Sequence, residues 1–209
     1  MTSAPLWRMA QQTVHSEMSS LSGLGLLSLL KRRLLTPRLR QIRLLVCDVD
    51  GVLTDGGLLY DEHGRVLKRF DVRDGLAIRM LERADITVAL LSGGRSGAIE
   101  QRAAHLDIQH CHVGVADKQQ GLVRLRAELG MARDHTAFIG DDLNDLVVRP
   151  VVGLLVTPAD AARGLRRQAD WVLRSRGGAG ALRECGEALL ASQGLLAAIH
   201  RDGWREGNP

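Results

Sequence analysis

The sequence predicts an α/β protein with a doubly wound parallel sheet, and two observations lead to this fold class. From residue 42 onward, short apolar runs alternate with segments of helical periodicity that are about ten residues long. Several of these runs are rich in Val and Ile and are apolar at consecutive positions, as strands covered on both faces are. Such alternation is typical of repeated βαβ units, and no insertion is long enough to form a cap domain.

The expected elements follow in chain order. The candidate strands are residues 42–47, 86–91, 136–139, 152–156 and 171–173. The candidate helices are residues 74–83, 96–105, 118–129, 143–148, 158–168 and 181–192. Residues 58–61 and 66–70 flank a turn in which Gly64 supplies the turn position, which predicts a β-hairpin inserted directly after the first strand.

Charge and composition divide the chain into an extension, residues 1–41, a globular domain, residues 42–195, and a tail, residues 196–209. The first 43 residues hold seven Lys/Arg and one acid, out of 28 basic and 24 acidic residues in all. The rest of the chain is therefore slightly acidic, and we expect no nucleic-acid binding by it. We expect the extension to be partly helical or disordered.

No membrane span is expected, because the longest apolar stretch of the extension, residues 21–30, is half of the roughly 20 residues that a span needs. Association of this basic, Leu-rich segment with a membrane surface stays open beside a frayed helix. Cys47, Cys111 and Cys185 are widely spaced and form no C-x-x-C pair. This usage is typical of a reduced, intracellular protein, and the expected location is cytoplasmic.

The first chemical motif follows the first strand directly. Asp48 and Asp50 stand two residues apart at the carboxyl end of that strand, where doubly wound sheets bind their ligands. Asp48 is the candidate nucleophile toward phosphorus, which would give an aspartyl-phosphate. Asp50 would protonate the leaving oxygen and then deprotonate the hydrolytic water. A D-x-D sequence alone is also common in solvated loops.

A second acidic cluster follows the strand at residues 136–139. Asp141, Asp142 and Asp145 would repel one another strongly without a cation, and Mg²⁺ prefers hard oxygen ligands of this kind. Asp141 is the expected direct ligand, and Asp145 is expected to orient bound water. Asp142 either shares that role or caps the following helix.

Two further groups complete a predicted phosphate site. Ser92 and Gly93 end the strand at residues 86–91 and precede a helix, so a hydroxyl and backbone N–H groups can face an anion. Lys118 opens a later helix and can neutralise phosphate charge. Each group alone also fits an ordinary turn or a surface lysine, but their order along successive strand ends makes coincidence improbable.

The motifs D-x-D-G-V-L-T, S-G, K and G-D-D-x-x-D are together similar to the haloacid dehalogenase superfamily of phosphotransferases. More narrowly, residues 48–55, 70–75 and 177–184 resemble the capless family of 3-deoxy-D-manno-octulosonate 8-phosphate phosphatases. The resemblance spans residues 42–195. It implies a Mg²⁺-dependent phosphomonoesterase that hydrolyses this sugar acid phosphate in lipopolysaccharide precursor synthesis.

The resemblance also implies roles for individual residues. It assigns Mg²⁺ to Asp48, Asp141 and the carbonyl of Asp50, and the phosphate to Ser92, Gly93 and Lys118. The implied substrate contacts are Asp71, Val72, Arg73, Asp74, Gly75, Arg79 and Arg102. Arg73 and Arg79 are expected to face one pocket, where a sugar acid carboxylate suits bidentate arginine. The implied assembly is a homotetramer in which hairpins pack together and a C-terminal tail closes a neighbour's site.

Three positions depart from the family pattern. Gly94 and Ala179 stand where the family keeps arginines, and Asp71 replaces a common Asn. These changes leave the chemistry at phosphorus untouched and affect the identity of the sugar acid. One alternative is therefore a phosphatase for another phosphosugar, such as a nine-carbon ulosonate 9-phosphate. The other is a non-catalytic assembly or regulatory partner, which the presence of Asp48, Asp50, Lys118 and Asp141 disfavours.

Overall fold

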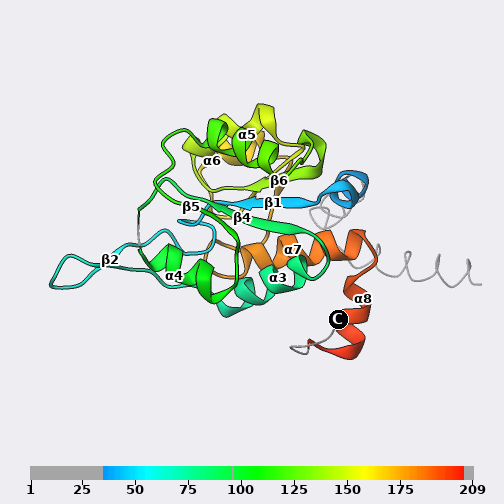
Figure 1. Ribbon diagram of the computed structural model, residues 1–209, viewed down its shortest axis with the longest axis horizontal. Helices are drawn as coiled ribbons and strands as arrows, with labels where there is room; N and C mark the ends of the chain where they lie inside the picture. The colour runs from blue at the N-terminus through cyan, green and yellow to red at the C-terminus, as the bar shows by residue number, and fades with distance from the viewer. Residues whose placement is uncertain (1–34, 96, 205–209) are drawn as a thin grey trace, which may run out of the picture. The chain divides into compact units, whose positions relative to one another are not determined.

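The computed structural model describes residues 35–95 and 97–204 of the chain (Figure 1). The chain divides into two units, Met1–Pro37 and Arg38–Pro209. Residues 35–41 are helical. Residues 1–34, which make up most of the predicted basic extension, lie outside the described residues.

A six-stranded sheet in the order β5-β4-β1-β6-β7-β8 forms the centre of the second unit. Its strands, in chain order, are β1 (Leu44–Cys47), β4 (Thr87–Leu91), β5 (His110–His112), β6 (Thr136–Ile139), β7 (Leu154–Thr157) and β8 (Trp171–Val172). Every neighbouring pair is parallel, and Leu44 of β1 pairs with both Thr87 and Thr136. The structure confirms the predicted fold class and leaves no cap domain among the described residues.

Helices cover both faces of the sheet (Figure 1). The helices α3 (Val72–Glu82) and α7 (Ala181–Ser192) pack against each other on one face. On the other face lie α5 (Lys118–Glu128), α6 (Arg163–Gln168) and the 3-10 helix η2 (Leu143–Val151). The remaining helices are α4 (Gly97–His105), η1 (Arg133–His135) and α8 (Leu196–Asp202).

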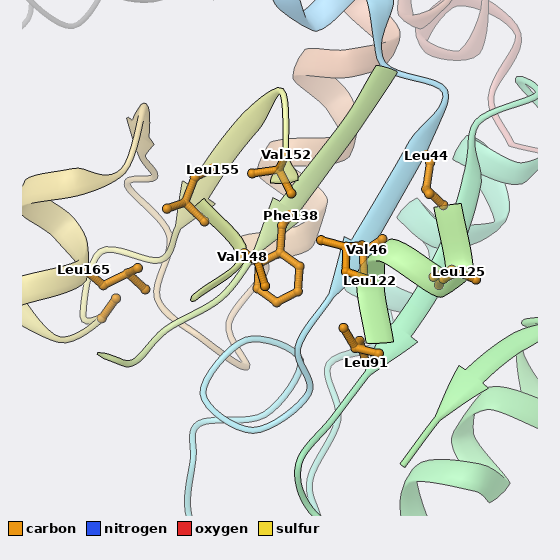
Figure 2. Packing of buried hydrophobic residues seen from close by; sticks show 12 residues of the cluster. Leu44, Val46, Leu91, Leu122, Leu125, Phe138, Val148, Val152, Leu155 and Leu165 are labelled. Carbon is orange, nitrogen blue, oxygen red and sulfur yellow. The ribbon is translucent and has the colours of Figure 1, made fainter. Parts of the chain in front are cut away.

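The core on the α5 and α6 side is built around Phe138 of β6, which is fully buried (Figure 2). Leu44 and Val46 of β1 and Leu122 of α5 belong to the same cluster. The alternate residues of β1, Leu45 and Cys47, are also fully buried, so both faces of this central strand are covered. This packing fixes the strand ends that carry the acidic motifs.

The predicted hairpin is formed by β2 (Leu59–Tyr60) and β3 (Val66–Leu67), which pair antiparallel with Leu59 opposite Leu67. The turn depends on Gly64, whose φ of 74° lies in the left-handed region that side chains other than glycine rarely adopt. The hairpin exposes large apolar side chains, including Leu59 at 62% and Tyr60 at 64%.

Two of the α-helices differ clearly from the prediction. The helix expected from residue 158 begins only at Arg163, because Ala162 has a non-helical ψ of 136° and its N–H donates to the carbonyl of Asp141 at 2.7 Å. The intervening loop is therefore tied to the acidic motif rather than wound into helix. In the tail, α8 extends over Leu196–Asp202, where no helix was expected.

Candidate active site

Asp48 and Lys118 form the centre of the site. Asp48 directly follows β1, and its backbone N–H donates to the carbonyl of Ile139 at 2.9 Å, which continues the sheet register into the motif. Lys118 is the first residue of α5, and its Nζ lies 2.8 Å from Asp48 Oδ2. Only 4% of the Lys118 side chain and 7% of the Asp48 side chain are exposed. The sequence-predicted nucleophile and lysine are thus a buried ion pair.

Asp145 is the second partner of this lysine, with Oδ1 at 2.6 Å from Lys118 Nζ. Its other oxygen, Oδ2, accepts hydrogen bonds from the backbone N–H groups of Asp141 at 2.9 Å and Asp142 at 3.2 Å. Asp142 accepts from the N–H of Leu143 at 2.7 Å and is the N-cap of η2. Of the two roles left open for Asp142, the structure therefore shows the cap.

Burial governs the electrostatics of the cluster. Burial raises the pKa of Asp48 to about 6, because the neighbouring Lys118 charge lowers it by less than desolvation raises it. Burial and the charges of Asp48 and Asp145 raise the pKa of Asp141 to about 7. Burial alone would lower the pKa of Lys118, but the two carboxylates beside it raise it above its ordinary value. These shifts share one cause: three carboxylates surround a single lysine, so the cluster has an excess of negative charge.

These residues fit a divalent hard cation. Oxygen atoms of Asp48, Asp141 and Asp145 lie within 4.8 Å of one another. Gly51 provides the space, because a Cβ at this position would lie 2.0 Å from Asp141 Oδ2. Clustered carboxylates, among them Asp48 and Asp141 with raised pKa values, and an uncrowded carboxylate oxygen are the donor chemistry that Mg²⁺ prefers. Lys118 contacts both Asp48 and Asp145, so an ion at this place would share these two carboxylates with the lysine.

Lys68 is a site residue that the sequence reasoning missed. It follows β3 of the hairpin, and its Nζ pairs with Asp50 Oδ1, while only 2% of its side chain is exposed. Thr54 also donates to this oxygen, at 3.4 Å. The sequence does place a lysine just after the second strand of the predicted hairpin. Its pairing with Asp50, however, depends on how the hairpin folds back onto the loop after β1. The structure shows that the hairpin supplies a cation to the first motif.

The Ser92 loop lies beside Asp50. Ser92 is 1% exposed, its N–H donates to the carbonyl of His112, and its Oγ accepts from the N–H of Gly94 at 3.1 Å. A Cβ at Gly94 would lie 3.2 Å from Asp50 Oδ2 and 3.5 Å from Ser92 Oγ. The loop that begins with Ser92 and Gly93 is therefore next to the first motif, as predicted from the strand order.

The segment 71–75 begins α3. Asp71 is the N-cap and accepts from the N–H of Arg73 at 2.8 Å, and its carboxylate also pairs with the Arg73 guanidinium at 2.7 Å. Val72 is 79% exposed. A Cβ at Gly180 would lie 3.5 Å from the guanidinium carbon of Arg73, which places Arg73 over the start of α7.

Three predicted substrate residues contact other parts of the chain. Arg79 Nη2 donates to the carbonyl of His105 at the end of α4, and the pocket that Arg79 is expected to share with Arg73 stays a prediction. The guanidinium carbon of Arg102 lies 5.6 Å from the centroid of the Phe70 ring, and its Nη2 donates to the Asp71 carbonyl at 3.3 Å. A Cβ at Gly75 would lie 2.5 Å from the same Nη2, so only glycine fits beside Arg102.

Asp74 is the third of these residues. It is 1% exposed, and its Oδ1 accepts a hydrogen bond from the N–H of Arg183 at 2.8 Å. This placement gives no support to a substrate contact through its side chain.

A parallel sheet with buried carboxylates at the ends of β1 and β6 is the arrangement of a haloacid dehalogenase-like hydrolase. A family model described as haloacid dehalogenase-like hydrolase matches residues 103–183. A 3-deoxy-D-manno-octulosonate 8-phosphate phosphatase from Haemophilus influenzae is 42% identical over 157 residues, which cover 75% of this chain and 87% of that protein. The chain therefore belongs to the family of 3-deoxy-D-manno-octulosonate 8-phosphate phosphatases, which are phosphoric monoester hydrolases.

Solved structures agree with this family. The phosphatase of the same name from Yersinia pestis has a TM-score of 0.77 and 43% identity, over 78% of this chain and 88% of that one. The Moraxella catarrhalis enzyme, solved with magnesium ion, phosphate ion and a KDO molecule, has a TM-score of 0.79 and 34% identity, over 81% and 98% of the two chains. That relative binds its metal, phosphate and sugar acid on a similar fold.

Proposed function

We propose that this chain hydrolyses 3-deoxy-D-manno-octulosonate 8-phosphate to the free sugar acid and phosphate, as a step in lipopolysaccharide precursor synthesis. The observation that supports this most directly is the buried cluster in which Lys118 bridges Asp48 and Asp145 beside Asp141. The names of relatives more than 40% identical supply the substrate. A non-catalytic role is disfavoured, because it has no use for buried charges that cost free energy to keep.

In this proposal Asp48 is the nucleophile. Its carboxylate oxygen forms a bond to phosphorus while the bond from phosphorus to the sugar oxygen breaks, and Asp50 gives its proton to that oxygen. Asp50 then takes a proton from water, whose oxygen attacks phosphorus and releases Asp48 and phosphate. Lys118, Ser92 and the Gly93 backbone hold the phosphoryl oxygens, and Lys118 keeps Asp48 oriented and ionised.

Mg²⁺ is the proposed cofactor, and the residues that would hold it are Asp48, Asp141 and the carbonyl of Asp50. When bound, the ion neutralises negative charge on the carboxylates and on the transferred phosphoryl group. Asp145 would orient the site without binding the ion directly. Its Oδ2 accepts hydrogen bonds from the N–H groups of Asp141 and Asp142 and so fixes the backbone that carries the Asp141 side chain.

Lys68 positions the proposed acid and base Asp50. We expect Lys68→Met to lower kcat at least about tenfold, because general acid–base catalysis requires a fixed proton donor. The matched control is Arg69→Met, which removes the next cation of the chain and an exposed ion pair with Asp55 at 3.4 Å. Steady-state phosphate release measures both variants, and equal kcat values for them would contradict the role of Lys68.

The substrate is tested by comparing kcat/KM for the eight-carbon sugar acid phosphate, a nine-carbon ulosonate 9-phosphate and simple hexose phosphates in the presence of Mg²⁺. We expect the eight-carbon ester to have the highest kcat/KM. The nine-carbon ester is the specific competitor, because Gly94 and Ala179 leave more room than arginines would. A higher kcat/KM for any ester outside the eight-carbon class would overturn the proposed substrate.

We further propose that the chain forms a homotetramer through its hairpins. Leu59 and Leu67 pair across the two strands and are 62% and 53% exposed, which is unusual for large apolar side chains on a free surface. We expect Leu59→Lys to lower the molar mass in light scattering, whereas Val123→Lys, at an exposed apolar position of α5, leaves it unchanged. A wild-type monomer would contradict the proposal.

A cytoplasmic location is also proposed. Cys47, Cys111 and Cys185 are all free thiols, which suits a reducing compartment. Among residues 35–95 and 97–204, the structure contains no helix that is both long and apolar enough to cross a membrane. Fractionation of cells that express the full chain tests the location, and recovery in the periplasm would contradict it.

A further inference from the structure

The glycine segment, residues 174–180, lies directly against the loop that carries the first motif. A Cβ at Gly177 would lie 1.9 Å from the carbonyl oxygen of Gly51, a distance at which no side chain fits. The N–H of Gly178 donates to the carbonyl of Val52 at 2.9 Å. Backbone therefore packs on backbone here, and any displacement of the glycine segment displaces the loop after β1.

Two carboxylates hold the glycine segment near its beginning. Glu184 accepts hydrogen bonds from the N–H groups of Arg174 at 3.0 Å and Ser175 at 2.8 Å. Asp160 accepts from the N–H of Gly177 at 3.0 Å. These contacts satisfy backbone donors that no strand or helix would otherwise pair.

Asp74 holds the other end, where the glycine segment enters α7. The N-cap of this helix is Gly180, with φ 92° and no side chain to accept from the first turn. Asp74 reaches across from α3, and its Oδ1 accepts from the N–H of Arg183 at 2.8 Å. The carboxylate also places negative charge at a helix N-terminus, where the helix dipole favours it. An acid on one helix thus supplies the cap that the other helix lacks.

Asp74 makes this contact from a buried position. Its Oδ2 is buried without a hydrogen-bond partner, and burial raises the pKa of Asp74 to about 6, so its charged form costs free energy. A neutral side chain would cap the helix without this cost. The carboxylate lies one residue from Arg73, whose guanidinium covers Gly180. The start of α3 and the glycine segment are therefore fixed relative to each other.

We propose that Asp74 is a positioning residue for the phosphatase reaction: by fixing the start of α7 it holds the glycine segment against the loop that carries Asp48 and Asp50. This inference rests on the proposed function only for the roles of Asp48 and Asp50. The family resemblance implies that residues at the start of α3 recognise the sugar acid. Under this proposal Asp74 instead fixes the geometry of the loop after β1.

The test compares Asp74→Ala and Asp74→Asn in the full chain with Mg²⁺, on p-nitrophenyl phosphate and on the eight-carbon sugar acid phosphate. A positioning role predicts that Asp74→Ala lowers kcat for both esters by the same factor, about tenfold or more, with little change in KM. Asp74→Asn keeps an oxygen acceptor and is expected to restore most of the loss. The control is Glu187→Ala, which removes the partner of Arg183 on the same helix.

Other outcomes would overturn the proposal. A rise in KM for the sugar acid phosphate alone, with normal turnover of p-nitrophenyl phosphate, would make Asp74 a substrate contact. A lower melting temperature with unchanged kcat would make it purely structural. Hydrogen exchange of residues 48–55 gives a readout independent of substrate. We expect faster exchange in Asp74→Ala, and exchange as slow as in wild type would exclude the proposal even where the proposed substrate proves wrong.

Discussion

We expect Asp48→Asn to lower phosphate release by about 10⁴-fold or more, because the amide removes the nucleophile and no other carboxylate replaces it. Asp50 is held by Lys68, and Asp145 is held by Lys118 and two N–H groups. Neither is free to take the place of Asp48. Stopped assays of phosphate release with Mg²⁺ in excess measure this loss.

The same variant is expected to fold. The folded-state pKa of Asp48 is raised to about 6, so its contribution to stability is present at low pH and is lost as pH rises through about 6. At pH 8 the neutral asparagine therefore does not lower the free energy of unfolding. Asp134→Asn, at an exposed acid before β6, is the control. Phosphate release by Asp48→Asn at a tenth of the wild-type rate would refute the nucleophile assignment.

Lys118→Met is expected to lower the free energy of unfolding by about 3–5 kcal/mol, because it leaves the buried charges of Asp48 and Asp145 without their cation. Urea denaturation in the presence of a chelator measures the loss. Addition of Mg²⁺ should recover part of it, since an ion that binds only the folded state stabilises that state. Catalysis should fall as well, because the phosphoryl oxygens lose a fixed cation.

A double variant separates charge from packing. In Lys118→Met/Asp145→Asn one of the two unpaired charges is gone, and the amide oxygen can still accept from the N–H groups of Asp141 and Asp142. We expect the double variant to be more stable than Lys118→Met alone. If the two variants unfold at the same urea concentration, the loss comes from packing of the lysine stem and not from charge.

Much of the fold could be predicted because its signals are local. β1 is apolar at every position, and β4 and β6 are apolar after a first threonine. The chemical groups follow the predicted strands, so Asp48, Asp141 and Lys118 could be brought together from topology alone. The cap of Asp142 could be named as an alternative for the same reason, since it depends only on the next turn of chain.

The remainder depends on contacts between segments distant in sequence. Lys68 reaches Asp50 only because the hairpin folds back, and Asp74 turns toward α7 only because α3 and α7 pack together. The family resemblance assigns Arg79 and Arg102 to the substrate, and in the structure they contact the His105 carbonyl at the end of α4 and the ring of Phe70. Neither contact could be predicted from the sequence, because each partner lies on another segment of the chain.

The placement of β1 has a consequence for how the protein is made. Leu44 pairs with Thr136 of β6, far along the chain, and the loop after β1 is contacted by glycines that are synthesised later still. During translation the first motif therefore leaves the ribosome long before its neighbours exist. A nascent chain that ends before residue 174 carries Asp48, Asp141 and Lys118 but lacks the backbone that packs against the loop after β1. Activity should therefore emerge late in synthesis, and stalled chains of increasing length would show when it begins.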